Sequence, residues 1–461
     1  MTCLYIAATQ KSSGKTTVTI GLCRELIRRG LSVQPFKKGP DYIDPLWLGR
    51  ATTRTCFNLD FHTMARDEIQ ALFAREQRCA NLSVIEGNVG LFDDIDIAGS
   101  TSNAEMAKLL RAPVLLVIDC HGMARGIAPL LLGYRSFDPD LRLAGVLLNK
   151  VGGTRHETNL RRVVEHYTDL PVVGAIHRSA EIQITERHLG LIPSNEFEQA
   201  ESQIESIRQA VMAQVDLDRV LAIAAEGGRP YGDQMTLQDE PARVAGRFAG
   251  VRLGIARDEV FGFYYPDDLL ALERAGAELI PFSPLHDGAL PPVDGLFIGG
   301  GFPECRMAEL EGNHMMRQAV ADFVADGRPV YAECGGLMYL SRRIEWGDQK
   351  RSMCGALQAD VRMHPRPQGR GYVRLLETAA FPWPRSSSEQ PWPEIRAHEF
   401  HHSAIVAPDP AWRYGYRVLR GAGIDGRHDG VVHKGLLASY SHLRDVGGTR
   451  WTERFLAHVA G

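Results

Sequence analysis

Two short segments that lie far apart in the chain carry residue types that can do chemistry. Residues 9–17 follow an apolar run and contain Gly14-Lys15-Thr16, which is typical of a phosphate loop leading into a helix. Residues 330–336 place Cys334 between an apolar run and a Gly-Gly pair, where a tight turn can expose a nucleophile. A nucleotide site combined with a cysteine nucleophile predicts the energy-driven transfer of a group from a donor that the thiol attacks.

The phosphate loop predicts ATP and Mg²⁺ as cofactors. In such a loop backbone N–H groups face phosphate oxygens, the lysine reaches the outer phosphates, and the following hydroxyl binds Mg²⁺. Thr9 stands where the pattern usually has its first glycine, but a strand-like run still precedes the loop and a helical pattern follows it. The residues predicted to bind the nucleotide are Ser13, Gly14, Lys15, Thr16 and Thr17, with Asn149 and Lys150 as candidates for reading adenine.

Acidic residues end or follow strand-like runs near this loop. Asp41 and Asp44 lie in a proline-bracketed segment that we expect to be a loop. Glu86 ends an apolar run, and Asp93 follows in the next loop. One such acid is more often a solvated charge, but several acids at the carboxyl ends of parallel strands predict a functional site. The predicted metal ligands are Thr16, Asp41 and Glu86, and the predicted partners of phosphates or substrate carboxylates are Lys37 and Lys38.

The cysteine segment has the companions that a catalytic thiol needs. A thiol at a helix N-terminus is expected to have a lowered pKa, which makes Cys334 a better nucleophile. His442 ends an apolar-to-polar segment and is the predicted general base. Gly300, Gly301 and Gly335 are predicted to turn backbone N–H groups toward an oxyanion. A lone buried cysteine is usually structural, but this combination favours catalysis, with ammonia from glutamine as the leading candidate for the transferred group.

The elements that must position these residues suggest two α/β domains. Continuous apolar runs alternate with helical patterns and predict parallel sheets covered on both faces. The predicted strands are 4–8, 32–36, 82–86, 114–118, 143–148 and 172–176, and, in the second domain, 278–282, 295–299 and 329–332. The predicted helices include 16–29, 103–110 and 157–166. Helical and polar residues between the two patterns predict a linker, so the expected division is 1–195, a linker at 196–248, and 249–461.

Composition limits the classes of partner. The chain has 461 residues, 23% of them charged, and a formal net charge of -4, which gives no reason to expect nucleic acid or a membrane surface as a partner. Its eight cysteines include no Cys-x-x-Cys pair, so reduced thiols are favoured over a disulfide framework or a structural zinc site. We expect no signal peptide and no membrane span, and therefore a soluble cytoplasmic protein. Whether the chain forms a homodimer is left open.

These motifs, in this order, resemble the cobyrinate/hydrogenobyrinate a,c-diamide synthase family, which amidates tetrapyrroles with nitrogen from glutamine. The resemblance covers nearly the whole chain. Its most specific parts are Gly-Pro-Asp-Tyr-Ile-Asp-Pro at 39–45 and Tyr-Ala-Glu-Cys-Gly-Gly at 331–336. The other matching segments are 13–17, 58–60, 86–91, 186–191, 263–267, 398–401 and 439–442. It implies a P-loop domain of the dethiobiotin synthetase type followed by a class I glutamine amidotransferase domain.

The resemblance also implies a reaction and roles for individual residues. Cys334 would form a glutamyl thioester and His442 would shuttle its proton, and the ammonia would pass internally to the ATP domain. There a carboxylate of a tetrapyrrole polycarboxylate would be activated as an acyl phosphate and amidated, so the protein would be a carbon–nitrogen ligase. Lys15, Thr16 and Glu86 would handle ATP and Mg²⁺. The residues implied in catalysis of this step are Asp41, Asp44 and Asp93, and those implied in substrate binding are Lys38, Tyr42, Asp44 and Asp93.

Three departures from the family pattern keep alternatives open. Trp47 stands near a usual histidine, and Asn88 differs from the usual valine, so sirohaem, sirohydrochlorin or nickel-sirohydrochlorin remain candidate substrates beside cobyrinate. Leu443 and Arg444 follow His442 where many class I amidotransferases carry a glutamate, so a cysteine–histidine dyad is expected. Two other classes also remain, an ATP-driven switch with a degenerate amidotransferase domain and a ligase that uses free carbon dioxide.

Overall fold

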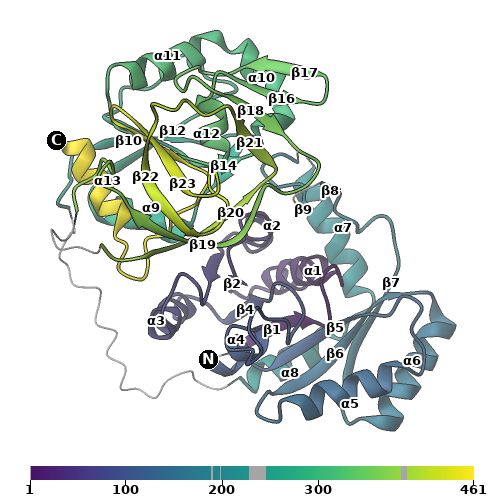
Figure 1. The fold of residues 1–461 in the computed structure, drawn as a ribbon. Helices are drawn as coiled ribbons and strands as arrows, with labels where there is room; N and C mark the ends of the chain where they lie inside the picture. The colour runs from purple at the N-terminus through teal and green to yellow at the C-terminus, as the bar shows by residue number, and fades with distance from the viewer. Residues whose placement is uncertain (1, 188–189, 198, 228–245, 386–391) are drawn as a thin grey trace. The chain divides into compact units, whose positions relative to one another are not determined.

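The structure, a computed structural model, describes residues 2–187, 190–197, 199–227, 246–385 and 392–461 and divides the chain into two compact units (Figure 1). The units are Met1–Leu237 and Gln238–Gly461, so their boundary falls outside the described residues. Part of the family-like segment 186–191 also falls outside them. Each unit has its own sheet and its own buried apolar clusters.

The first unit is built on a parallel sheet in which seven described strands have the order β3-β2-β4-β1-β5-β6-β7. Its strands are nearly continuous apolar runs because both faces of a parallel sheet are buried. Their bounds are β1 Thr2–Ala8, β2 Val33–Lys38, β3 Phe57–Leu59, β4 Leu82–Glu86, β5 Val114–Asp119, β6 Leu143–Val151 and β7 Val172–His177. All six strands predicted in this part of the sequence are present, which places β1 and its phosphate loop at the centre of the sheet.

Helices connect these strands and cover the sheet (Figure 1). Their bounds are α1 Lys15–Arg28, α2 Ile43–Thr52, α3 Arg66–Gln77, α4 Asn103–Leu109, α5 Ile127–Phe137, α6 Thr154–Tyr167, α7 Ala200–Met212 and α8 Leu217–Ala225, and a short hairpin is formed by β8 Glu186–Arg187 and β9 Gly190–Leu191. Apolar residues of α1, α2, α7 and α8 share one buried cluster with residues of β1. These four helices therefore pack together with the strand that leads into the phosphate loop.

The first unit extends beyond the boundary expected at residue 195. Helices α7 and α8 lie in the segment 196–248 that the composition predicted as a linker, yet Ile204, Ile207 and Val211 are fully buried. Helix α7 packs tightly against α1, because a Cβ added to Gly21 of α1 would lie 2.7 Å from a methyl carbon of Val211. The polar residues that suggested a linker are the solvent-facing sides of two amphipathic helices.

The segment expected to be a proline-bracketed loop instead contains the start of α2. Pro45 is tolerated there because the first turn of a helix does not need its N–H. Trp47, on the same helix, is fully buried, donates from Nε1 to the carbonyl of Ile192 (2.9 Å) and packs near Phe197. The ring of Trp47 therefore lies in the core under α2.

This placement of Trp47 gives a testable prediction. Trp47→Phe is expected to lower the free energy of unfolding by roughly 1–3 kcal/mol, because it removes the Nε1 hydrogen bond and leaves unfilled volume. Substrate choice should not change. Urea unfolding and product analysis measure the two effects, with Trp346→Phe on a partly exposed strand as the control. Altered substrate choice at unchanged stability would contradict the core assignment.

The second unit contains a sheet in which nine described strands have the order β12-β10-β13-β15-β24-β23-β22-β19-β20. Strands β12 to β24 of this order run parallel, and those from β24 to β20 pair antiparallel. The bounds are β10 Arg252–Ala256, β12 Glu278–Phe282, β13 Gly295–Ile298, β15 Val330–Glu333, β19 Gly369–Glu377, β20 Ile395–His401, β22 Arg413–Arg420, β23 His428–His433 and β24 Leu436–Ser439. The three later strands predicted from sequence are thus confirmed as β12, β13 and β15.

Smaller elements complete the second unit (Figure 1). Its helices are α9 Pro266–Arg274, α10 Met307–Gly312, α11 His314–Ala325, α12 Gly335–Leu340 and α13 Trp451–Ala460. The remaining strands are β11 Phe261–Phe263 with β14 Gly300–Gly301, and β16 Arg343–Trp346, β17 Gln349–Ser352, β18 Asp360–Met363 and β21 Ser403–Val406. Within the described ranges of either unit, no helix is both long and apolar enough to cross a membrane.

Candidate functional site

The phosphate loop connects β1 to α1 and is held by the end of β6. Gly14 has φ 86°, and a Cβ there would lie 2.3 Å from Nδ2 of Asn149, so only glycine fits. Asn149 donates from Nδ2 to the Ser13 carbonyl (2.8 Å), and Lys150 donates from Nζ to the Ser12 carbonyl (2.7 Å). Asn149 and Lys150 therefore brace the loop, and adenine recognition by them stays a prediction.

Two side chains at the start of α1 face the centre of the site. Lys15 donates from Nζ to the carbonyl of Val89 (3.0 Å), and burial followed by the nearby charge of Lys37 lowers its pKa to about 8. Thr16 donates from Oγ1 to Oε1 of Glu86 (3.0 Å). Thr17 is half-buried in the same turn. The predicted lysine, hydroxyl and strand-end carboxylate are thus brought together.

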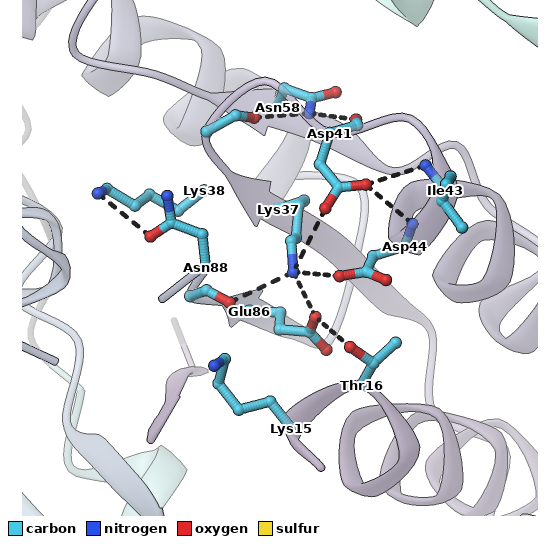
Figure 2. A network of polar contacts seen from close by, with 12 residues as sticks. Lys15, Thr16, Lys37, Lys38, Asp41, Ile43, Asp44, Asn58, Glu86 and Asn88 are labelled. Atoms are coloured by element: carbon cyan, nitrogen blue, oxygen red, sulfur yellow. Dashed lines mark hydrogen bonds and ion pairs between the residues drawn. The ribbon is translucent and has the colours of Figure 1, made fainter. Parts of the chain in front are cut away.

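The ammonium group of Lys37 lies among three carboxylates and the backbone, as Figure 2 shows. Its Nζ lies 2.5 Å from Oδ2 of Asp44, 2.6 Å from Oε1 of Glu86 and 3.9 Å from Oδ2 of Asp41, and it also donates to the carbonyl of Gly87 (3.3 Å). The ends of β2 and β4, the segment that links β2 to α2, and the first turn of α2 supply these groups. We call this group of residues the Lys37 cluster. Lys37 was predicted to be a partner of phosphates or substrate carboxylates, but it was not among the residues predicted to bind the nucleotide or the metal.

The charges of the Lys37 cluster are strongly coupled. Desolvation opposes the ammonium charge, but attraction by Asp44, Glu86 and Asp41 outweighs it and raises the pKa of Lys37 well above its usual range. Desolvation also opposes the Asp44 carboxylate, but Lys37 outweighs it and lowers the pKa of Asp44. Burial raises the pKa of Glu86, and burial together with Asp44 raises that of Asp41 to about 7. The Lys37 cluster is therefore a dense site of mutually dependent charges.

The oxygen atoms around Thr16 fit a magnesium ion that also binds phosphates. Oε2 of Glu86 is buried without a hydrogen-bond partner, and Oε1 already accepts from Thr16. Among the residues that the structure describes, no group of three or more His, Cys, Asp or Glu side chains is arranged to hold a metal alone. Mg²⁺ at nucleotides commonly takes only one or two protein ligands. Asp41 instead accepts from the N–H groups of Ile43 and Asp44 with Oδ1, so its predicted role as a metal ligand remains untested.

The residues predicted to bind the substrate lie around the same sheet edge. Lys38 is almost completely buried, contacts Oδ1 of Asn88 (3.4 Å), and has its pKa lowered to about 8 by burial. Asp93 accepts from the N–H of Gly90 (2.9 Å), which fixes the loop after β4. Tyr42 is buried next to Asp41 at the start of α2. Binding of a substrate carboxylate by Lys38 stays a prediction.

In the second unit, Cys334 lies on a strained turn between β15 and α12. Its φ and ψ are 47° and −100°, which is unusual for a residue other than glycine and typical of a nucleophile held on a sharp turn. Its N–H donates to the carbonyl of Ser439 at the end of β24 (2.7 Å). The pairing of β15 with β24 brings the segment that ends in His442 next to the cysteine, because Glu333 pairs with Ser439.

The predicted oxyanion glycines surround this turn. A Cβ on Gly335 would lie 2.8 Å from the backbone nitrogen of Gly301, so the two backbones are in close contact. A Cβ on Gly300 would lie 2.7 Å from Cε1 of His442, the ring carbon between the two nitrogens. The structure thus brings Cys334, His442 and the three predicted glycines together, although they come from three separate segments.

The pKa of the Cys334 thiol differs from the one predicted from the sequence. Burial raises the pKa of Cys334 well above its ordinary value, and the nearby charge of Glu304 adds to the effect. The lowered pKa expected from a helix N-terminus is wrong, because α12 has only six residues and desolvation outweighs its effect. The raised pKa favours the protonated thiol, so the predicted nucleophilic role of Cys334 would require a base that takes its proton.

His442 is held by contacts on several sides. Its Nδ1 lies 3.3 Å from Oε2 of Glu333. Its backbone N–H donates to the carbonyl of His398 (2.8 Å), and the imidazole rings of His442 and His398 stack with their centroids 4.8 Å apart. Asp429 is completely buried and accepts from the N–H groups of Tyr440 and Ser441, which fixes the chain before His442. The predicted dyad therefore has a third neighbour, Glu333, whose only signal in the sequence is a strand-end acid directly before the nucleophile.

Comparison with known proteins gives a match to each unit. Residues 4–192 match the CobQ/CobB/MinD/ParA nucleotide binding domain, and residues 252–445 match the CobB/CobQ-like glutamine amidotransferase domain. These matches confirm the predicted order of a phosphate-loop α/β domain followed by an amidotransferase domain.

The chain is also similar, over nearly its whole length, to proteins named cobyrinate a,c-diamide synthase. The one from Magnetococcus marinus is 45% identical, covering 98% of this chain and 96% of its own. The one from Syntrophotalea carbinolica is 42% identical, with 95% and 94% covered, and the one from Methanothermobacter thermautotrophicus is 39% identical, with 98% of each chain covered.

Proposed function

This chain belongs to the cobyrinate a,c-diamide synthase family, and we propose that it uses ATP and glutamine to convert the a and c acetate carboxylates of cobyrinate to amides. The observation that carries the proposal is that each unit contains the groups one half-reaction needs. The Lys37 cluster lies beside the phosphate loop, and Cys334 lies beside His442 and the glycines. The protein is accordingly a glutamine-dependent carbon–nitrogen ligase.

The second unit releases ammonia. Sγ of Cys334 attacks the side-chain amide carbon of glutamine while His442 takes the thiol proton, and backbone N–H groups near Gly301 and Gly335 stabilise the oxyanion. The carbon–nitrogen bond then breaks, and the leaving nitrogen takes that proton and departs as ammonia. Water hydrolyses the glutamyl thioester to glutamate and restores the thiol. The raised pKa of Cys334 fits this order, because the proton leaves only as the new bond forms.

The first unit activates the carboxylate. A carboxylate is a poor acyl acceptor for ammonia, because its charge repels nucleophiles and oxide is a poor leaving group. An oxygen of the substrate carboxylate therefore attacks the terminal phosphorus of ATP, ADP leaves, and ammonia displaces phosphate from the acyl phosphate. Lys15 and Lys37 offset the negative charge that accumulates. Thr16 and Glu86 would hold Mg²⁺, which neutralises phosphate charge when bound.

The alternatives differ in what they leave unexplained. An ATP-driven switch gives no purpose to the convergence of Cys334, His442 and Gly300. A ligase that uses free carbon dioxide needs no second unit. Sirohaem, sirohydrochlorin and nickel-sirohydrochlorin stay possible substrates for the same chemistry, but the burial of Trp47 removes one reason for preferring them. A homodimer and a cytoplasmic location stay predictions.

Mass spectrometry tests the proposed substrate directly. The protein is incubated with ATP, Mg²⁺, glutamine and, in separate reactions, cobyrinic acid, hydrogenobyrinic acid, sirohydrochlorin, nickel-sirohydrochlorin or sirohaem. Each amide formed lowers the mass of the macrocycle by about one unit, so the number of amides and the preferred substrate come from one measurement. We expect two amides on cobyrinic acid. If only another macrocycle is amidated, that macrocycle is the substrate. If no glutamine is hydrolysed at all, the ATP-driven switch is favoured.

Lys38 predicts a pH dependence of substrate binding. Burial lowers the pKa of Lys38 to about 8. The side chain is therefore positively charged below this pH and loses its charge as the pH rises above it. The KM for the macrocycle is therefore expected to rise above pH ~8, by at most about tenfold per pH unit for one lost charge. Lys38→Arg keeps the charge and should remove this rise, whereas Lys38→Gln should have a high KM at every pH. The same rise in Lys38→Arg would assign the effect to another group.

A further inference from the structure

We infer that Glu333 is the positioning residue that completes the catalytic dyad, an inference that rests on the proposed glutamine chemistry. Its carboxylate lies one residue before the nucleophile, at the end of β15, and is almost completely buried. Oε2 faces Nδ1 of His442 at 3.3 Å. The sequence left the third residue open, and the structure places this carboxylate where a catalytic histidine is usually oriented.

The other bonds of Glu333 fix the orientation of its carboxylate. Oε1 accepts from the backbone N–H of Leu443 (2.9 Å) and from the hydroxyl of Tyr331 (2.5 Å). Because the N–H of Leu443 can only donate, Oε1 must remain an acceptor, and Oε2 is left for the imidazole. The carboxylate of Glu333 thus contacts both the imidazole of His442 and the backbone of Leu443.

This arrangement selects the tautomer of His442. A carboxylate only accepts hydrogen bonds, so the proton of neutral His442 is placed on Nδ1 and Nε2 keeps the lone pair that a base needs. During attack, the thiol proton moves to Nε2, and Glu333 stabilises the imidazolium without taking a proton itself. The proton then passes from Nε2 to the departing nitrogen. The ring of His398 stacks on the ring of His442 and is a further titratable group beside it.

The position two residues after His442, where many class I amidotransferases carry a glutamate, holds an arginine in this chain. Arg444, two residues after His442, has a fully buried side chain and is paired with Asp267 at 2.8 Å. A cation at this position cannot accept the Nδ1 proton. The acceptor therefore comes from the other strand of the site, from Glu333 instead of a residue after the histidine.

The test compares two buried glutamates. In Glu333→Gln, the amide oxygen must face the N–H of Leu443, so the amide NH₂ faces Nδ1 and favours the tautomer whose Nε2 carries the proton. The kcat of glutamine hydrolysis is expected to fall about 10²–10⁴-fold, as in a triad whose acid is made an amide, with little change in KM. The control Glu377→Gln changes a buried glutamate that pairs with Arg454 and should keep its kcat. Nitrogen NMR of the histidines reports the tautomer of His442 directly.

The outcomes separate the inference from the function it rests on. A lowered kcat together with a shift of the His442 proton from Nδ1 to Nε2 supports the positioning role. Unchanged hydrolysis by Glu333→Gln, or a lowered rate with the tautomer unchanged, overturns it. Amidation with added ammonia, measured on the same preparation, shows that the protein is folded. If Cys334→Ser also hydrolyses glutamine normally, then the proposed function has failed and not only the inference.

Discussion

Cys334→Ser is expected to abolish amidation with glutamine while leaving amidation with ammonia intact. A serine hydroxyl is a far weaker nucleophile than the thiol, so glutamine hydrolysis should fall at least about 10³-fold. Activation of the carboxylate depends on the first unit and does not use this side chain. Product formation is followed by mass spectrometry with glutamine alone and with a high concentration of ammonium salt at mildly alkaline pH.

A matched control is available on the same unit. Cys354 lies between β17 and β18 of the small sheet, is partly exposed, and is not part of the site. Cys354→Ser should therefore keep both activities. Loss of ammonia-dependent amidation in Cys334→Ser would contradict the separation of the two half-reactions. Retention of glutamine-dependent amidation would contradict the assignment of the nucleophile.

Lys37→Met should show the opposite pattern, with amidation lost for both nitrogen donors and basal glutamine hydrolysis kept. Lys37 compensates Asp44, Glu86 and Asp41, so its removal leaves buried carboxylates unpaired. Breaking a buried charge pair costs about 3–5 kcal/mol of stability. Loss of a preorganised cation beside the phosphates is expected to lower the amidation rate at least about 10²–10³-fold.

Activity should be measured below the unfolding transition of each variant, which circular dichroism determines. Lys108→Met serves as the control, because Lys108 forms ion pairs with Glu105 and Asp138 on the surface of the same unit. Its cost should stay below about 1 kcal/mol, with both activities retained. Normal amidation by Lys37→Met would show that the cluster is only structural.

The strands and the two half-sites are the parts that the sequence predicts well. Parallel strands buried on both faces are continuous apolar runs, so β1, β2 and β4 to β7 stand out without any knowledge of their neighbours. Gly14-Lys15-Thr16 and Cys334 with its glycines are local patterns whose geometry follows from a strand, a turn and a helix. Such features depend on residues that are adjacent in the chain.

The parts that the sequence does not predict depend on burial and on pairing between distant strands. Lys37 was predicted only as a partner of phosphates or substrate carboxylates, and the register of β2 with β4 is what places it beside Glu86. The register of β15 with β24 likewise brings Glu333 next to the segment that ends in His442. The pKa of Cys334 depends on desolvation, which the sequence does not state. Polar faces of α7 and α8 suggested a linker, although their apolar faces complete the core.

Transfer of nitrogen from glutamine to the macrocycle can be followed with an isotope label. The protein is incubated with ATP, cobyrinic acid and glutamine whose amide nitrogen is the heavy isotope, and proton–nitrogen NMR correlation is used to detect labelled amides on the purified macrocycle. Two labelled primary amides per macrocycle are expected, and none with Cys334→Ser. Hydrolysis of glutamine and consumption of ATP without label in the macrocycle would contradict the proposed transfer.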